Sequence, residues 1–401
     1  MPTSCHVSSL GAIITEMFSF SSHKKIDSLN LIIDIQSSVV RGALILVKSD
    51  ATPRVLWTSS SDIAYRPDGG SSYLVSSALQ AIETISSSAH VFIHDAHAHE
   101  AIPNHITGIH CVLSSPWIVS CARTVVQQFE KDTRIHSAHI HDIIAAERLR
   151  AVAKDGDAMV SVEEKIFDVR LNGYSVFLWK DVVARTLEVS FAVSMASTDT
   201  IKHFTEACKK SGFHGRVDFH SSLLLQQIGV GIIMPVHDSY ILIHVHGELT
   251  DIVVANNQSC ILFGSYPRGI RTVVRNITEK LSISDSAAES LLTLYENKQI
   301  DSQHGLRDIE SVHTVGVDWN KDGDEVLALI PKNYTPVQAI ISSRSHEIFF
   351  KNEFESLHQH IVTEVLTTDT LFTHIKFDPQ TEQLRLTALY MIAIQHLEIL
   401  R

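Results

Sequence analysis

The stretch LNLIIDIQSSVVRGALI, Leu29–Ile45, predicts two apolar strands joined by a short turn of small residues. An acid, Asp34, stands at the end of the first strand, and Ser37 and Ser38 follow in the turn. Several nucleotide-binding folds present a phosphate loop in this way, because the N–H groups of a tight turn can bind phosphate oxygens. Gln36 stands where such loops usually carry glycine. The stretch therefore predicts a phosphate cradle that departs from the usual pattern.

The layout of this stretch recurs about 210 residues later. Residues 239–269, SYILIHVHGELTDIVVANNQSCILFGSYPRG, again predict three consecutive strands with a small-residue turn after the first. The first copy continues with a strand over 54–60, a helix from about Ser72 to Ser86 and a strand over 89–96. An internal repeat of this kind predicts two similar α/β layers.

The residues between and after the two copies add further elements. Between them we expect a compact α+β unit, with two strands around Ser114–Pro116, a helix over 139–155, strands over 163–171 and 185–196, and a helix over 198–212. After the second copy we expect helices over 270–281 and 285–297, a strand over 324–331, a helix and then a strand within 336–350, and a helix over 382–400.

Composition limits the class of protein. The formal net charge is −12, which argues against general nucleic-acid binding because that function needs a basic face. The five cysteines are scattered without a CxxC pair, which fits a reducing cytoplasm. Residues 1–28 contain Leu10, Ile13, Ile14, Met17 and Phe18 at helical spacing, so this tail is either a short membrane-surface or partner helix or a disordered leader.

The duplicated layers resemble the actin-like ATPase superfamily, and within it the FtsA and PilM group. In that group the two turns carry D-[IV]-G-[ST]-S and D-[IV]-G-G-G-T-T-D-[IV]; the matching residues here are 34–38, DIQSS, and 244–252, HVHGELTDI. The inserted unit falls where the group has its 1C subdomain. Residues 285–297 resemble its Ala-Glu-x-x-Lys helix, with Ala288 and Glu289 kept. The resemblance covers about residues 28–397 and depends on layout more than on any single motif.

The resemblance implies an α/β, two-lobed actin-like (ribonuclease H-like) fold with an inserted α+β 1C subdomain. The implied divisions are a tail over 1–28, subdomain 1A over 29–112 and 209–235, 1C over 113–208, subdomains 2A and 2B over 236–378, and a closing helix over 379–401. It also implies ATP and Mg²⁺ as cofactors, with Asp34 at the metal and the following nucleotide contacts: Asp34, Ser37, Ser38, Gly247, Thr250, Asp251 and Glu289. No catalytic residue is assigned.

Several of these cradle positions depart from the group pattern. His244 replaces the second acid, and imidazole is a poor ligand for Mg²⁺. Glu248 adds a negative charge beside the phosphate position, and Ser342 and Ser343 replace the glycines of the adenosine loop. Hydrolysis of ATP, nucleotide binding without turnover, and a scaffold without nucleotide stay open as alternatives. The departures favour the scaffold, with weak hydrolysis or none.

The implied function is an FtsA-like, membrane-associated division scaffold that binds the tubulin-like division protein. The alternative is a PilM-like pilus assembly protein that binds a peptide of an inner-membrane protein beside 1C. A phosphotransferase of the same superfold is a third alternative. We expect self-association, no nucleic-acid partner, and a cytoplasmic location at the inner face of the membrane. FtsA proteins end in an amphipathic membrane helix, whereas residues 383–400 look like a closing helix, which favours PilM.

Two other patterns carry less weight. His94, His97 and His99 form one cluster of metal-ligand types, and His136, His139 and His141 form another; we attribute both to the 24 histidines of the chain. Residues 318–325, DWNKDGDE, begin like a calcium loop, but Leu329 stands where the bidentate Glu belongs. We therefore expect a polar turn there.

Overall fold

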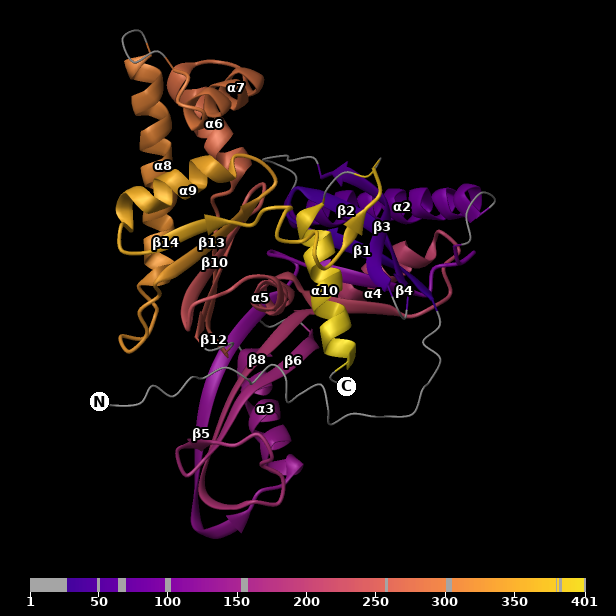
Figure 1. Cartoon of the computed structure of the whole chain (residues 1–401), viewed down its shortest axis with the longest axis vertical. Coiled ribbons are helices and arrows are strands. Elements are labelled where there is room, and N and C mark those ends of the chain that lie inside the picture. The colour runs from indigo at the N-terminus through magenta and orange to yellow at the C-terminus, as the bar shows by residue number, and fades with distance from the viewer. Residues whose placement is uncertain are drawn as a thin grey trace, which may run out of the picture.

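The computed structural model describes residues 27–48, 51–63, 70–97, 102–152, 158–256, 259–300, 305–379, 381 and 384–399. The described elements form two α/β lobes and a narrow third sheet that projects away from them (Figure 1). The expected helix of the tail lies outside the described residues, as does His99 of the expected histidine cluster.

The first lobe contains a six-stranded sheet in the order β15-β3-β2-β1-β4-β9. The second lobe contains a five-stranded sheet in the order β12-β11-β10-β13-β14. Their strands are β1 Ser28–Ile35, β2 Val39–Lys48, β3 Ala51–Asp62, β4 Gly108–Leu113, β9 Val217–Ser221, β10 Ser239–Val245, β11 Thr250–Asn256, β12 Ser259–Tyr266, β13 Gln338–Ser343, β14 Val362–Val365 and β15 Lys376–Phe377.

The internal repeat is present in the register of the strands. Asp34 pairs with Arg41 across β1 and β2, and His244 pairs with Asp251 across β10 and β11 at the same spacing. A parallel strand, β4 or β13, follows on the other side of β1 or β10. Both turns close with the same backbone hydrogen bond. In the first turn Gln36 N donates to the Val39 carbonyl at 3.0 Å, and in the second His246 N donates to the Leu249 carbonyl at 2.8 Å.

Helices cover both sheets and also fill the space between them. α2 (Gly70–His97) and α4 (Thr198–Lys209) cover the outer face of the first sheet, and α6 (Ile270–Leu281), α7 (Asp285–Glu296), α8 (Leu306–Leu327) and α9 (Glu347–Leu357) cover that of the second. α5 (Ser222–Ile233) and α10 (Arg385–Ile399) lie between the sheets (Figure 1). One apolar core therefore includes residues of both lobes, such as Ile32, Leu242 and Leu389. Burial of this area opposes separation of the lobes.

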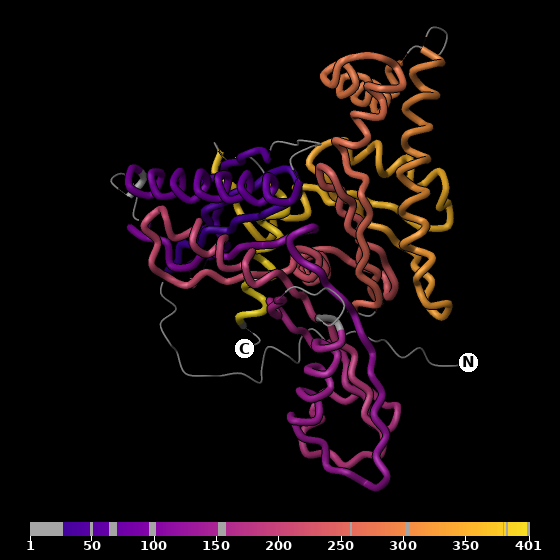
Figure 2. The backbone as a smooth tube through the Cα atoms, turned by 180° about the vertical axis from the view of Figure 1, so that it is seen from behind, coloured from indigo at the N-terminus to yellow at the C-terminus, as the bar shows by residue number. Residues whose placement is uncertain are grey.

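The inserted unit is a four-stranded sheet in the order β5-β8-β6-β7, backed by one helix. Its elements are β5 Val119–Arg134, α3 Ser137–Val152, β6 Met159–Leu171, β7 Tyr174–Ser175 and β8 Val183–Ser197. It has its own apolar core, and its far end lies well away from both lobes (Figure 2). α4, which follows β8, contributes Phe204 and Cys208 to the core of the first lobe. The expected subdomain boundaries stay a prediction.

Three predictions of local structure are wrong. Residues 89–96 continue helix α2, because Ile85, Ala89 and Ile93 extend its buried stripe at helical spacing. Residues 318–327 continue α8 rather than forming a polar turn and a strand, because Val315 and Trp319 bury its inner face. In the segment 336–350, the strand β13 precedes the helix α9.

Candidate functional site

The two repeated turns contact each other directly. The backbone N–H of Glu248 donates to Ser37 Oγ at 3.4 Å, which joins the second lobe to the first. Gly247 lies so close that a Cβ added to it would be 1.9 Å from Ser38 Oγ. Both serine side chains are buried. Ser37 and Ser38 of the first turn are therefore in contact with Glu248 and Gly247 of the second.

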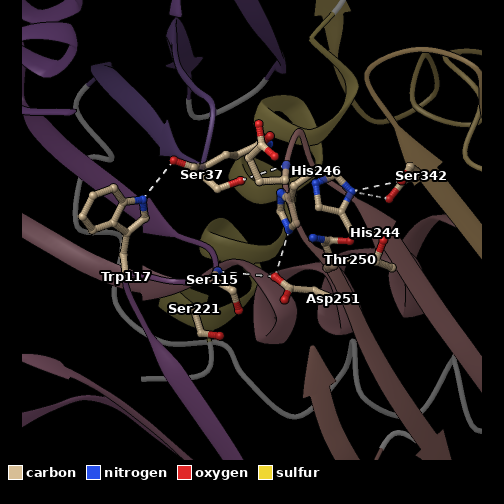
Figure 3. Close-up of polar contacts among 12 residues, drawn as sticks. Ser37, Ser115, Trp117, Ser221, His244, His246, Thr250, Asp251 and Ser342 are labelled. Carbon is tan, nitrogen blue, oxygen red and sulfur yellow. Dashed lines mark hydrogen bonds and ion pairs between the residues drawn. The ribbon is translucent and has the colours of Figure 1, made fainter. Parts of the chain in front are cut away.

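A buried polar cluster lies behind these turns (Figure 3). On the second lobe, His246 Nε2 is 2.8 Å from Asp251 Oδ2, and the rings of His244 and His246 meet edge to face at 4.0 Å. On the first lobe, Gln36 Nε2 donates to Asp34 Oδ2 at 2.8 Å. The side chains of Asp34 and Asp251 are fully buried, so their contacts are shielded from water.

Burial shifts the titration of this cluster. Removal from water raises the pKa of Asp34, and the Arg41 guanidinium, 3.9 Å away, offsets this only in part. Burial, together with the neighbouring His246 ring and the Arg41 guanidinium, lowers the pKa of His244 well below its usual range. His244 is therefore held neutral, and its Nδ1 contacts Ser342 Oγ at 2.8 Å.

Groups that could bind a phosphate already have partners. The first N–H groups of α6, those of Ile270 and Arg271, donate to the carbonyls of His246 and Gly247 at 2.9 and 2.8 Å. The Glu248 carboxylate turns away to form two bonds with Arg275, at 3.0 and 2.6 Å. Its charge is therefore paired with Arg275 and no longer points to repulsion of a bound phosphate. What opposes phosphate binding instead is that the backbone N–H groups near the turn already donate to other partners.

The remaining predicted site residues have structural contacts or lie apart. Thr250 Oγ1 donates to the Arg268 carbonyl at 2.5 Å and accepts a bond from Trp319 Nε1 at 3.1 Å. Asp251 also accepts a bond from the Ser115 backbone at 3.4 Å, which ties the second lobe to the start of the inserted unit. Glu289 is exposed on α7, and no described contact links it to either turn.

These residues do not fit Mg²⁺-ATP in this arrangement. Within the described ranges, no group of three or more His, Cys, Asp or Glu side chains is placed to hold a metal ion. Asp34 keeps one oxygen, Oδ1, without a hydrogen-bond partner, but His244 occupies the place of the second acid. Ion pairs also bridge the lobes at the adenosine side, where Asp62 lies 3.6 Å from Arg271 and 3.2 Å from Arg344.

A second candidate site lies between the first lobe and the inserted sheet. This cavity of about 610 Å³ is here called the edge groove. It is lined by every residue of Val160–Ile166 on β6, by Val217–His220 on β9, and by Arg216 just before β9. Side chains alternate between the two faces of a strand, so lining by consecutive residues means that strand edges border the groove. β9 is an edge strand of the six-stranded sheet. β6 pairs with β7 only at Arg170 and Leu171, so the edge of its other residues has no β7 partner.

The floor of the edge groove is polar and partly buried. Glu163 Oε2 accepts the Ser221 backbone N–H at 3.2 Å, and Glu163 Oε1 lies 3.6 Å from His220 Nδ1. His220 Nε2 in turn lies 3.3 Å from His110 Nδ1. α10 contributes Ile394 and Leu397 to the opposite wall. The groove thus offers strand edges, apolar side chains and a fixed carboxylate.

Sequence reasoning missed the residues that connect these sites. His246 could have been noticed, because it follows His244 by two residues and so shares its face of the strand. Arg271, Arg275 and Asp62 gave no comparable signal, since their partners are distant in the chain. The edge groove requires knowledge of which strands end each sheet, which local periodicity does not contain.

The two layers with matching turns, the two helices between them and the inserted sheet define an actin-like ATPase fold. No family model and no curated protein matches the sequence. Among solved structures, the fold is similar to the "PilM-PilN type IV pilus biogenesis complex", with a TM-score of 0.61 and 12% identity over 92% of this chain and 98% of that one.

Two further solved structures have lower TM-scores. The ethanolamine utilization protein EutJ from Carboxydothermus hydrogenoformans has a TM-score of 0.46, with 10% identity over 90% of this chain and 89% of that one. MreB 5 of Spiroplasma citri bound to AMPPNP has a TM-score of 0.44, with 9% identity over 93% of this chain and 96% of that one.

In the described part of the chain, no helix combines the length and apolarity needed to cross a membrane.

Proposed function

We propose that this protein is a scaffold that binds a short extended segment of a membrane protein in the edge groove, without hydrolysing ATP. The observation that carries the proposal is the groove itself, which exposes the borders of β9 and β6 side by side. An extended peptide gains affinity by adding its backbone hydrogen bonds to such an edge, and gains specificity from alternate side chains.

The likeness to the PilM–PilN complex supports a role in pilus assembly at the inner face of the cell membrane. Charge describes the segment further. Four acids and two bases line the groove: Glu163, Glu164, Asp218, Glu398, Lys165 and Arg216. The preferred segment should therefore combine apolar side chains with a net positive charge. Binding of the tubulin-like division protein is the competing function.

The proposal that the scaffold works without hydrolysing ATP is supported by the contacts that the two turns already make. Ser37 and Ser38 contact Glu248 and Gly247 of the facing turn, and the N–H groups at the start of α6 bind backbone carbonyls. A phosphotransferase would need these groups for its phosphates. The same contacts therefore favour a scaffold over hydrolysis or transfer.

Fluorescence anisotropy of labelled peptides tests the groove. The probes are N-terminal cytoplasmic segments of pilus inner-membrane proteins and the C-terminal segment of the tubulin-like division protein. Val160→Lys should weaken binding of the pilus segment about tenfold or more, because it places a positive charge on the wall that faces a positively charged segment. Val126→Lys is the matched control, since Val126 is 54% exposed on the same sheet and Val160 38%.

Two results would count against the proposal. Equal affinity of the two variants would move the binding site away from the edge groove. Binding of the division segment alone would replace the pilus function by the division function.

A further inference from the structure

The far end of the inserted sheet carries an unusual group of apolar side chains. Phe177 is 95% exposed, Leu178 80% and Tyr174 78%, the highest values among the large hydrophobic residues that the structure describes. We call these three residues the apolar apex. Tyr174 begins β7, and Phe177 and Leu178 follow before β8 begins at Val183. These segments belong to the inserted sheet, which projects away from both lobes (Figure 1). Exposed groups of this kind commonly mark interaction sites.

The apex is held in place by the fold. Val176 N donates to the Val169 carbonyl at 2.9 Å on one side, and Asp181 N donates to the Ile135 carbonyl at 2.8 Å on the other. Val176 and Trp179 pack against the core of the inserted unit. These two anchors flank Phe177 and Leu178, so the two side chains between them are presented to solvent by an ordered backbone.

The charges near the apolar apex favour contact with a partner whose surface is negatively charged. Two acids of this region are paired with arginines, Asp132 with Arg185 and Asp168 with Arg170, both at 2.7 Å. Asp181 Oδ1 lies 3.1 Å from His136 Nδ1, a contact that balances its charge only when the histidine is protonated. Lys180 lies two residues after Leu178, with Nζ 5.8 Å from the centre of the Trp179 ring. Lys131 and Arg134 stand on the adjoining end of β5, where Glu130 is the opposing charge.

We propose that the apolar apex inserts into the headgroup region of an anionic lipid bilayer, with Lys180, Lys131 and Arg134 contacting lipid phosphates. Aromatic and aliphatic side chains next to lysine and arginine match the boundary between headgroups and acyl chains. Each cation near such a surface adds to the attraction. A second copy of the chain fits less well, because three side chains provide far less than the roughly 1,200 Å² of a stable protein interface.

Co-sedimentation of the full chain with vesicles tests the proposal. The vesicles are phosphatidylcholine alone and phosphatidylcholine mixed with phosphatidylglycerol. Phe177→Ser/Leu178→Ser should reduce binding to the anionic vesicles by about tenfold or more. The matched control is Leu149→Ser/Leu329→Ser, because these leucines are 69% and 67% exposed elsewhere. Thermal unfolding of all variants should be unchanged, since none of the four side chains is buried.

Two further measurements separate lipid contact from other causes. Lys131→Glu/Lys180→Glu should weaken binding to anionic vesicles and leave binding to neutral ones unchanged. Brominated lipids should quench Trp179, and Trp179→Phe should remove that quenching.

Three results would overturn the proposal. They are absence of vesicle binding by the wild-type chain, equal binding by the apex variant, and a concentration-dependent dimer that the apex variant abolishes while vesicles have no effect. The last result would assign the apex to a second copy of the chain. Because the apex and the edge groove share no residues, peptide binding can be measured independently of each outcome.

Discussion

Gly247→Ala is a sharp test of whether the two turns meet in solution. The new Cβ would lie 1.9 Å from Ser38 Oγ and 2.3 Å from Ser38 Cβ, well inside van der Waals contact. Ser38 is only 5% exposed, so its side chain has little room to move. Overpacking of this kind costs about 1–3 kcal/mol in the free energy of unfolding.

Variants at Ser38 identify the contact that causes this cost. Ser38→Ala removes Oγ but keeps Cβ, so it should rescue Gly247→Ala only in part. Ser38→Gly removes both atoms and should rescue it further, although the greater freedom of glycine in the unfolded chain offsets part of this gain. In a double-mutant cycle, the combined variant should be more stable than the sum of the single effects by about 1 kcal/mol or more.

Urea unfolding followed by tryptophan fluorescence measures these differences, and Trp117 reports on the turn because its Nε1 donates to the Gln36 carbonyl at 2.9 Å. Gly231→Ala is the control, since no atom lies within 4 Å of the Cβ it would add. Wild-type stability of Gly247→Ala, with no coupling to Ser38, would refute the contact. The turns would then stand apart in solution, and the space between them would be open to a nucleotide.

Two other predictions concern the same region. ATP with Mg²⁺ should leave the melting temperature unchanged, whereas a bound nucleotide at a hundredfold excess over Kd would stabilise the protein by about 2.7 kcal/mol, and a clear shift in scanning fluorimetry would contradict the occupied cradle. His244 has a lowered folded-state pKa, so as the pH falls below the ordinary value of 6.5 the unfolded chain binds a proton that the folded chain excludes. Between pH 6.5 and 5, the free energy of unfolding of the wild type should therefore fall by up to about 1.4 kcal/mol per pH unit more than that of His244→Gln. Urea unfolding at several pH values measures both, and an equal fall in the two proteins would disprove this role of His244.

The repeated layers were predictable because each depends on contiguous residues. An apolar strand, a small-residue turn and a second strand follow one another in 29–45 and again in 239–256, and the register confirms their equivalence. Residues 89–96 were ambiguous, because a short apolar run fits a strand or a helix until its neighbours are known. The place beside β1 that this run could have taken is occupied by β4.

The state of the cradle was only partly predictable. The replacement of an acid by His244 was visible in the sequence, and it correctly drew attention to this turn. The contact of Gly247 with Ser38 depends on how the lobes are positioned by the core that α5 and α10 share with both sheets. Arg275 likewise changes the role of Glu248 from a repelling charge to a paired one, across 27 positions of sequence. Such effects arise from packing and cannot be found by comparing one turn with a motif.

The apolar apex and the edge groove both lie along β6, so the position of one on a membrane fixes the distance of the other from it. β6 lines the groove as far as Ile166 and ends at Leu171, next to the apex. At about 3.3 Å per residue, this part of the strand spans roughly 17 Å. With the apex in the headgroup region and β6 upright on the membrane, the near end of the groove would stand about that far above the apex. A membrane protein would then reach it only with an extended segment of several residues between its membrane anchor and the bound part, which is the arrangement that edge-strand recognition requires.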